Sequence, residues 1–154
     1  MKKVKIAIGC DDAAFDLKEI IKQQLIESGY AVDDFGAYDN KPTLYPDKAF
    51  AVAQSIADGN HERGILLCGT GIGMAIAANK VFGIRAAVCH DAYSAERARK
   101  SNNAQILALG ARIIGVELAK SVVDIWLKSE FQGGGSIEKV EQISIYERNN
   151  KNKS

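Results

Sequence analysis

The segment from Cys68 to Met74 reads Cys-Gly-Thr-Gly-Ile-Gly-Met, and it is the part of the chain best suited to chemistry. Glycines let backbone amides approach a ligand closely, and a helix beginning after them adds its positive end. Such a loop suits a phosphate or a developing enediolate oxygen. A thiol between a strand and a helix favours the thiolate, which could act as base, nucleophile or redox centre. The spacing fits neither a dinucleotide fingerprint nor a Walker loop.

Other side chains that could touch a ligand lie near the ends of expected strands or helices. Asp11 and Asp12 could orient a substrate hydroxyl, although capping the next helix is the commoner use of such residues. Arg112 could bind phosphate through a bidentate contact or form a surface salt bridge. His90 could act as an acid or base near neutral pH, although a lone His at a strand end is more often structural. Asn102 could bind a hydroxyl or end a helix.

The elements that must position these residues follow from hydrophobic spacing and from glycine and proline breaks. The expected strands lie at 4–8, 30–36, 64–68, 84–89 and 105–109. The expected helices lie at 11–29, 47–59, 75–80, 92–101, 117–128 and 137–148, with 37–46 a loop that holds both prolines. This alternation predicts a doubly wound α/β fold with a five-stranded parallel sheet. Ligands bind beyond the carboxyl ends of the strands in such sheets, which favours the segments 9–12, 68–74 and 89–91.

The composition narrows the functional class. The chain has 154 residues and a net charge of +1, so we expect one domain over 1–148, with a disordered polar tail at 149–154. No basic stripe indicates nucleic-acid binding, and the apolar start is too short for a signal peptide or a membrane span. The three cysteines lack metal-ligand spacing, and their odd number is typical of a reduced compartment. We therefore expect a cytoplasmic protein without a metal site.

The chain resembles the ribose-5-phosphate isomerase type B family, which is grouped with the galactose-6-phosphate isomerase subunits. The resemblance runs from about Val4 to Ile143. It is carried by the segments Ile8–Asp11, Tyr45–Asp47, Gly64–Gly73, Ala77–Lys80, Cys89–Asp91, Asn102–Ala104, Gly110–Gly115 and Val123–Asp124. It implies a Rossmann-like fold of three layers, with a C-terminal helix that packs on a partner subunit. It also implies a homodimer or a dimer of dimers with shared active sites, and neither metal nor organic cofactor.

The resemblance also implies residue roles. Cys68 looks like the base that moves a proton between C1 and C2, and Thr70 looks like its helper in ring opening or proton relay. The amides of Gly69, Gly71 and Gly73 look like the cradle of the enediolate. The expected substrate contacts are Asp11, Tyr45, Asn102 from the partner subunit and, for the phosphate, Arg112.

Four positions depart from the family pattern. Asp12 and Ser101 stand where the family usually has histidines, the second of which is the expected acid–base group for opening the sugar ring. Gly135 and Lys139 stand where arginines usually bind the phosphate. Asp12, a water, Ser101 or the partner's His90 could replace the lost acid, and Lys139 could still bind phosphate.

These departures bear on the substrate. The expected activity is metal-independent aldose–ketose isomerisation of the ribose 5-phosphate/ribulose 5-phosphate type. An alternative is a tetrose or tetrulose 4-phosphate isomerase of tetritol catabolism, since O4 of that substrate carries the phosphate and cannot close a furanose ring. The segments Tyr93–Ala98 and Ser101–Ile106 also resemble family members of that kind. Further alternatives are a galactose-6-phosphate-type subunit, a non-catalytic sugar-phosphate-binding subunit and a redox-sensing thiol protein.

Overall fold

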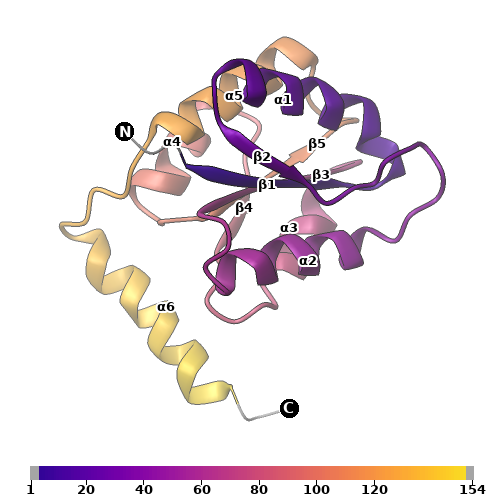
Figure 1. The fold of residues 1–154 in the computed structure, drawn as a ribbon. Coiled ribbons are helices and arrows are strands. Elements are labelled where there is room, and N and C mark those ends of the chain that lie inside the picture. Colours follow the sequence, from indigo (N-terminus) through magenta and orange to yellow (C-terminus); the bar gives the residue numbers. More distant parts are fainter. Residues whose placement is uncertain (1–3, 152–154) are drawn as a thin grey trace.

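The central strand of the fold is β3 (Arg63–Cys68), in which all six residues are buried. A strand without polar alternation must be covered on both faces, as in a parallel sheet between two helical layers. The computed structural model describes residues 4–151 and has this architecture (Figure 1). The sheet has the order β2-β1-β3-β5-β4 and is parallel throughout. The flanking strands are β1 (Lys5–Cys10), β2 (Ala31–Asp34), β4 (Ala86–Val88) and β5 (Ile106–Gly110).

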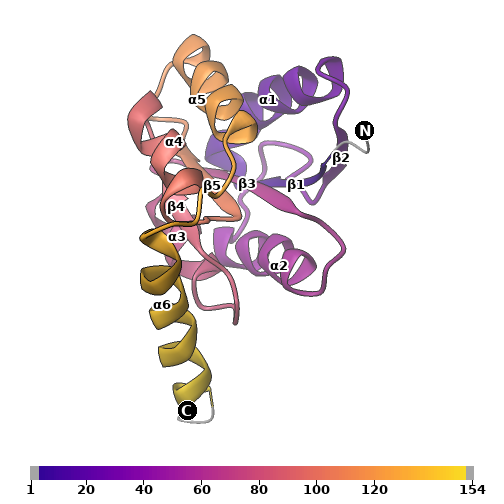
Figure 2. The same ribbon diagram turned by 90° about the vertical axis from the view of Figure 1, so that its left-hand side faces the viewer.

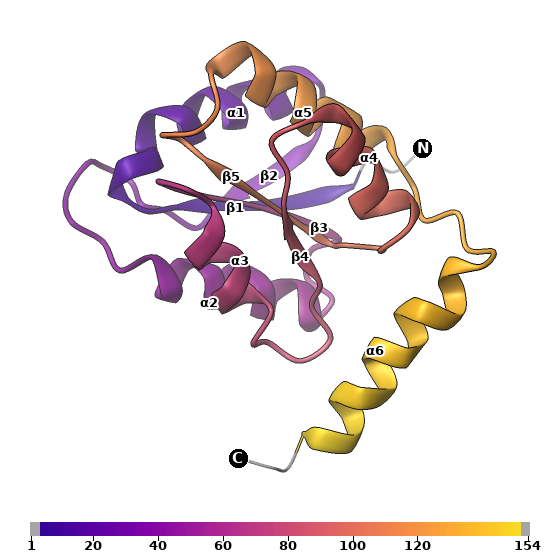
Figure 3. The same cartoon turned by 180° about the vertical axis from the view of Figure 1, so that it is seen from behind.

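Helices cover both faces of the sheet, so the predicted α/β fold of three layers is confirmed (Figure 3). One face packs against α1 (Phe15–Glu27), α4 (Ala92–Lys100) and α5 (Val116–Lys128), with Trp126 fully buried there. The other packs against α2 (Tyr45–Ala57) and α3 (Ile72–Ala78). Each helix returns the chain from the carboxyl end of one strand to the amino end of the next. The carboxyl ends of the strands therefore lie at one edge of the sheet, and the C-terminal ends of the helices lie at the opposite edge.

Three element boundaries that matter for the site differ from the prediction. Helix α3 begins at Ile72 rather than at residue 75, so the end of the glycine loop is already helical. Helix α2 begins at Tyr45 rather than at Asp47, because Pro46 fits the first turn of a helix, where its missing N–H costs nothing. The expected strand at 84–89 shortens to three residues at the sheet edge. Tyr45 is therefore fixed at a helix start, although the sequence predicted a loop there.

The C-terminal helix α6 (Ser136–Asn150) stands away from the rest of the molecule (Figures 1 and 2). None of its residues is buried, and its contacts with the main body include a bond from the Gly83 amide to Glu147. It continues two residues past the predicted end at 148, because Asn150 donates a side-chain bond to the Tyr146 carbonyl and satisfies an open helix end. Residues 149–150 are therefore helical, contrary to the predicted tail, and 152–154 lie outside the described residues.

Candidate active site

A cleft of about 430 Å³ opens at the carboxyl end of β3, where the sequence predicted the site. Most of the predicted site residues meet there, although they come from four separate stretches of the chain. The lining consists of Asp11, Tyr45, Cys68, Gly69, Thr70, Ile72, Gly73, Ile76 and Arg112. The convergence follows from the topology, because β1, β3 and β5 are neighbours and end at the same edge.

Cys68 is the last residue of β3, and its side chain is held against the glycine loop. The Gly71 amide donates to its Sγ at 3.1 Å, which provides a partner for the thiolate form. The loop can come this close because Gly71 has a φ of +79°, and a Cβ there would meet the Leu109 backbone at 3.0 Å. The loop is also bound to the end of β5, since the Arg112 amide donates to the Gly69 carbonyl at 3.0 Å. The thiol therefore lies on a rigid support.

Tyr45 forms one wall of the cleft and lies directly over Gly73. A Cβ at Gly73 would come within 2.5–2.7 Å of the Tyr45 ring and hydroxyl, so the ring occupies the space that a side chain would fill. The rim of the cleft is apolar, with Ile72 and Ile76 55% and 58% exposed. Sequence reasoning missed both isoleucines. Their i, i+4 spacing after the glycine loop places them on one helix face and could have revealed them.

Asp11 and Arg112 give the cleft its opposite charges. Asp11 caps the short 3-10 turn at Asp12–Ala14, accepting a bond from the Ala14 amide at 3.2 Å. Burial, followed by the neighbouring Asp12 carboxylate, raises the pKa of Asp11, while amide bonds and Arg112 oppose that rise. The Arg112 side chain is exposed and lies across Gly69. Among residues 4–151 no side-chain hydrogen bond or ion pair is found for the Arg112 guanidinium, which lines the cleft and is open to an anion such as phosphate.

Two of the predicted residues are close to the cleft but engaged elsewhere. The Asp12 carboxylate accepts the Thr43 amide at 3.0 Å and holds the loop before α2. The Nε2 atom of His90 accepts the Gly110 amide at 2.8 Å, and burial lowers the pKa of the ring despite the adjacent Asp91. Because Nε2 accepts from the Gly110 amide, this nitrogen carries no proton of its own, and the ring helps to hold the end of β5. Neither side chain lines the Cys68 cleft.

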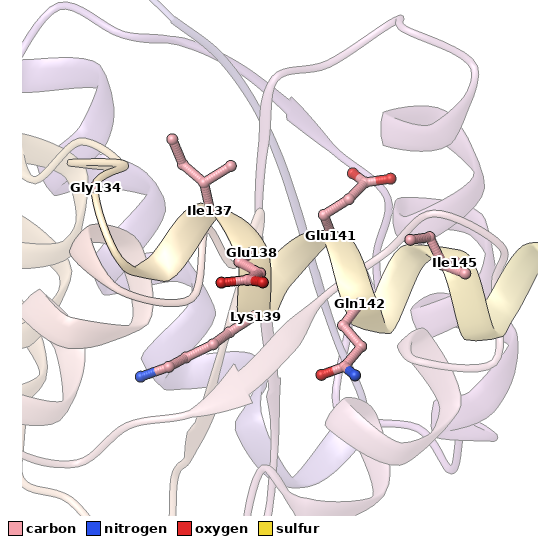
Figure 4. A pocket seen from close by; sticks show the side chains of 7 residues that line it. All are labelled: Gly134, Ile137, Glu138, Lys139, Glu141, Gln142 and Ile145. Carbon is pink, nitrogen blue, oxygen red and sulfur yellow. The ribbon is translucent and has the colours of Figure 1, made fainter.

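The remaining predicted residues lie away from Cys68 within one chain. Ser101 and Asn102 follow the end of α4, which the topology puts at the opposite edge of the sheet. Asn102 lines a second cleft of about 420 Å³ along β4 and α4. Gly135 precedes α6, and Lys139 lies on α6 beside a hollow of about 750 Å³. Figure 4 shows Lys139 and Gln142 on one side of that helix, with Ile137 and Glu141 on another.

No group of three or more His, Cys, Asp or Glu side chains in 4–151 could hold a metal ion. None of the helices found in this range is both long enough and apolar enough to span a membrane.

Comparison with known proteins points to one family. The sequence profile of the ribose/galactose isomerase family matches residues 6–143. A Pectobacterium atrosepticum protein named D-erythrulose-4-phosphate isomerase is 59% identical, covering 96% of this chain and 98% of that protein. A Listeria innocua protein named Ribose-5-P isomerase B is 50% identical, covering 96% and 100%. The structure of Clostridium thermocellum ribose-5-phosphate isomerase B has a TM-score of 0.93 and 48% identity, covering 94% and 98%.

Proposed function

The chain belongs to the ribose/galactose isomerase family, and from that premise we propose that it interconverts D-erythrulose 4-phosphate and its aldose. Its activity as an aldose–ketose isomerase of sugar phosphates follows from the family and the names of its relatives. The substrate is our proposal. The observation that carries it is that Ser101, directly after α4, stands where the family resemblance places the histidine that opens the sugar ring. A 4-phosphate cannot close a furanose, so its isomerase needs no such group.

Cys68 is the proposed base. Its thiolate takes a proton from C1 of the ketose and returns it to C2, while the proton on O1 passes to O2, so that an enediol lies between ketose and aldose. Thr70 is suited to that relay between oxygens, since it lies on the cleft wall. The amides of Gly69 and Gly73, which line the cleft, would face the oxyanion, whereas the Gly71 amide that the resemblance also assigned to the cradle is bound to Cys68 Sγ. Removing one such donor typically costs about 3–4 kcal/mol of transition-state stabilisation. Asp11 and Tyr45 would hold substrate hydroxyls, and Arg112 would attract the phosphate.

We further propose that the working unit is a dimer whose sites combine two chains. The Cys68 cleft is not lined by Ser101, Asn102 or Lys139 of the same chain. If these residues touch substrate, they must do so in the cleft of a second chain. A two-fold axis can bring one edge against the other edge of a second copy. Helix α6 supports this arrangement, because it buries no residue in its own chain while Ile137, Ile143 and Tyr146 are 57%, 56% and 72% exposed. Lys139 could then reach the partner's phosphate.

Ribose 5-phosphate is the second candidate substrate. It was the first expectation from the sequence, and the 50% identity to a protein named Ribose-5-P isomerase B favours it. The cleft would then need a ring-opening acid from Asp11, a water or a second chain.

A substrate panel tests the proposal. The purified chain is assayed with aldose and ketose phosphates of four, five and six carbons, and exchange of the C2 proton with solvent is followed by NMR. We expect the highest kcat/KM for erythrulose 4-phosphate and loss of turnover in Cys68→Ala, with the fold and oligomeric state kept. A kcat/KM that is far higher for ribose 5-phosphate would overturn the substrate. Full turnover by Cys68→Ala would overturn the mechanism, and an inactive wild-type chain would favour a binding subunit.

A further inference from the structure

Arg97 and Ser101 form a pair at the end of α4 that the proposed mechanism does not use. The Nε and Nη2 atoms of Arg97 donate to the Ser101 hydroxyl oxygen at 2.7 and 2.5 Å. The remaining terminal nitrogen, Nη1, lies 3.6 Å from the Glu96 carboxylate, in a loose pair whose side chains are 34% and 37% exposed. Arg97 lines the cleft of about 420 Å³ together with Asn102. The guanidinium is therefore held in one orientation beside a residue that the family resemblance assigns to substrate binding.

The Arg97 and Ser101 side chains can only donate hydrogen bonds to a ligand. A serine hydroxyl has two acceptor lone pairs and one hydrogen. Because Arg97 donates twice to the Ser101 oxygen, the hydroxyl has only its hydrogen left to offer a ligand. A guanidinium has no acceptor and stays protonated in proteins. The pair can bind an oxyanion, but it cannot take a proton from a sugar or supply one for ring opening.

The position of O4 relates this restriction to substrate length. In the furanose form of a pentose 5-phosphate, O4 is the ring oxygen, and a group that opens the ring must exchange a proton near it. In a tetrulose 4-phosphate, O4 is the ester oxygen of the phosphate, which carries nearly two negative charges at neutral pH. A group directed at O4 therefore meets a ring oxygen in one substrate and an anion in the other. Only the anion suits a fixed cation that cannot exchange protons.

We propose that Arg97, oriented by Ser101, binds the phosphate of a tetrulose 4-phosphate in the Cys68 cleft of a second copy of the chain. Arg97 is then a specificity-determining residue, and Ser101 is a positioning residue. The inference rests on the proposed function for both the substrate and the shared site. The bidentate geometry of a guanidinium matches phosphate oxygens, and its orientation before binding lowers the entropic cost of that contact.

Three variants test the proposal: Arg97→Leu, Arg97→Lys and Ser101→Ala. For Arg97→Leu we expect KM for erythrulose 4-phosphate to rise about 10- to 100-fold, as for loss of a charge-assisted bond, with a much smaller change in kcat. Competitive inhibition by inorganic phosphate should weaken by a similar factor. Arg97→Lys should restore part of the affinity, because it keeps the charge but loses the planar fork. Ser101→Ala should give an intermediate KM, since the cation stays but is no longer oriented.

A matched control separates this role from a general effect of removing a helix cation. Lys128 forms an i, i+4 pair with Asp124 near the end of α5, as Arg97 does with Ser101 on α4. Lys128→Leu should leave KM and phosphate inhibition unchanged. If Arg97→Leu lowers the unfolding temperature but not the affinity for substrate or phosphate, Arg97 is structural and the proposal is wrong.

A hybrid dimer tests whether Arg97 acts across chains. Chains carrying Cys68→Ala and Arg97→Leu are co-expressed with different tags, and the hybrid is isolated. One of its two sites then combines an intact Cys68 with an intact Arg97 from the other chain. At low substrate concentration we expect about half the wild-type activity per dimer. Activity no higher than that of the Arg97→Leu homodimer would overturn action across chains.

The two proposals fail in different ways. A wild-type preference for ribose 5-phosphate contradicts the proposed function before any variant is made. A wild-type preference for erythrulose 4-phosphate, with an unchanged KM in Arg97→Leu, keeps the proposed function and overturns only the role of Arg97.

Discussion

The Tyr45 ring lies so close to Gly73 that one methyl group can test whether its position matters for turnover. In Gly73→Ala the new Cβ would come within 2.5–2.7 Å of the ring, so one of the two groups must move. Gly73 belongs to α3 and lacks a positive φ, so alanine suits the backbone and favours the helix by about 0.5–1 kcal/mol. Tyr45 is 39% exposed and can swing outward. We therefore expect the ring to leave the cleft while the protein stays folded.

The size of the effect follows from what the ring contributes. A neutral hydrogen bond to substrate is worth about 0.5–1.5 kcal/mol, so its loss should lower kcat/KM about 2- to 10-fold. The free energy of unfolding, measured in urea, should change by less than about 1 kcal/mol, because gained helix propensity offsets lost ring contacts. Gly115→Ala is the matched control, since a Cβ there meets no atom within 4 Å. Its kcat/KM should equal that of the wild type.

A double variant isolates the cause. In a Tyr45→Ala background, Gly73→Ala should have no further effect on kcat/KM, because the ring it displaces is gone. Wild-type kcat/KM in the single Gly73→Ala variant would refute the role of Tyr45. An equal loss in both backgrounds would mean that the methyl group disturbs the loop amides instead.

Three further predictions concern charge and burial. Iodoacetamide at pH 8 should label Cys68 first, because burial raises the pKa of Cys10 and of Cys89 to about 11; peptide mass spectrometry would contradict this if either labelled as fast. Asp11→Asn should lower kcat/KM yet leave the fold at least as stable at pH 7. Because the pKa of Asp11 is raised in the folded protein, its ionisation lowers the free energy of unfolding at pH 7, and Asp11→Asn removes this destabilisation. The difference in free energy of unfolding between the variant and the wild type should disappear below about pH 4 in urea titrations. Lys18→Met should destabilise the fold by about 2–4 kcal/mol in the same assay, because the fully buried ammonium bonds Asp34 and the Ala37 carbonyl at 2.7 and 2.8 Å; full stability would contradict it.

The fold was largely predictable because its signals are local. The apolar run at 64–68 can only be a strand covered on both faces, and the structure has β3 there, beginning one residue earlier. The start of α2 was misplaced because both prolines of 37–46 were read as loop residues. Pro46 is in fact the kind of residue that opens a helix, a signal present in the sequence.

The site was predictable only where strands end. Asp11, Cys68 and Arg112 follow β1, β3 and β5, so parallel pairing brings them together without any information beyond the strand order. The Arg97–Ser101 pair escaped notice because an i, i+4 pair of this kind has no apolar pattern, and its partner atoms depend on rotamers. The bond between Gly110 and His90 escaped for the same reason, since nothing in the sequence says which ring nitrogen faces an amide.

Polar groups lie at both edges of the sheet, at the carboxyl ends of the strands and at the C-terminal end of α4. The strand β3 places Cys68 and its loop at one edge of the sheet, where the proposed mechanism assigns the proton transfer to the thiol and backbone amides. Arg97, Ser101 and Asn102 lie at the C-terminal end of α4, at the other edge of the sheet, and none of them belongs to a buried strand. If a two-fold axis joins the two edges, residues at the end of α4 can vary without disturbing the β3 loop. Substitutions there should therefore alter which sugar phosphate is accepted, through KM, while the rate of proton exchange at C2 for a bound substrate stays the same.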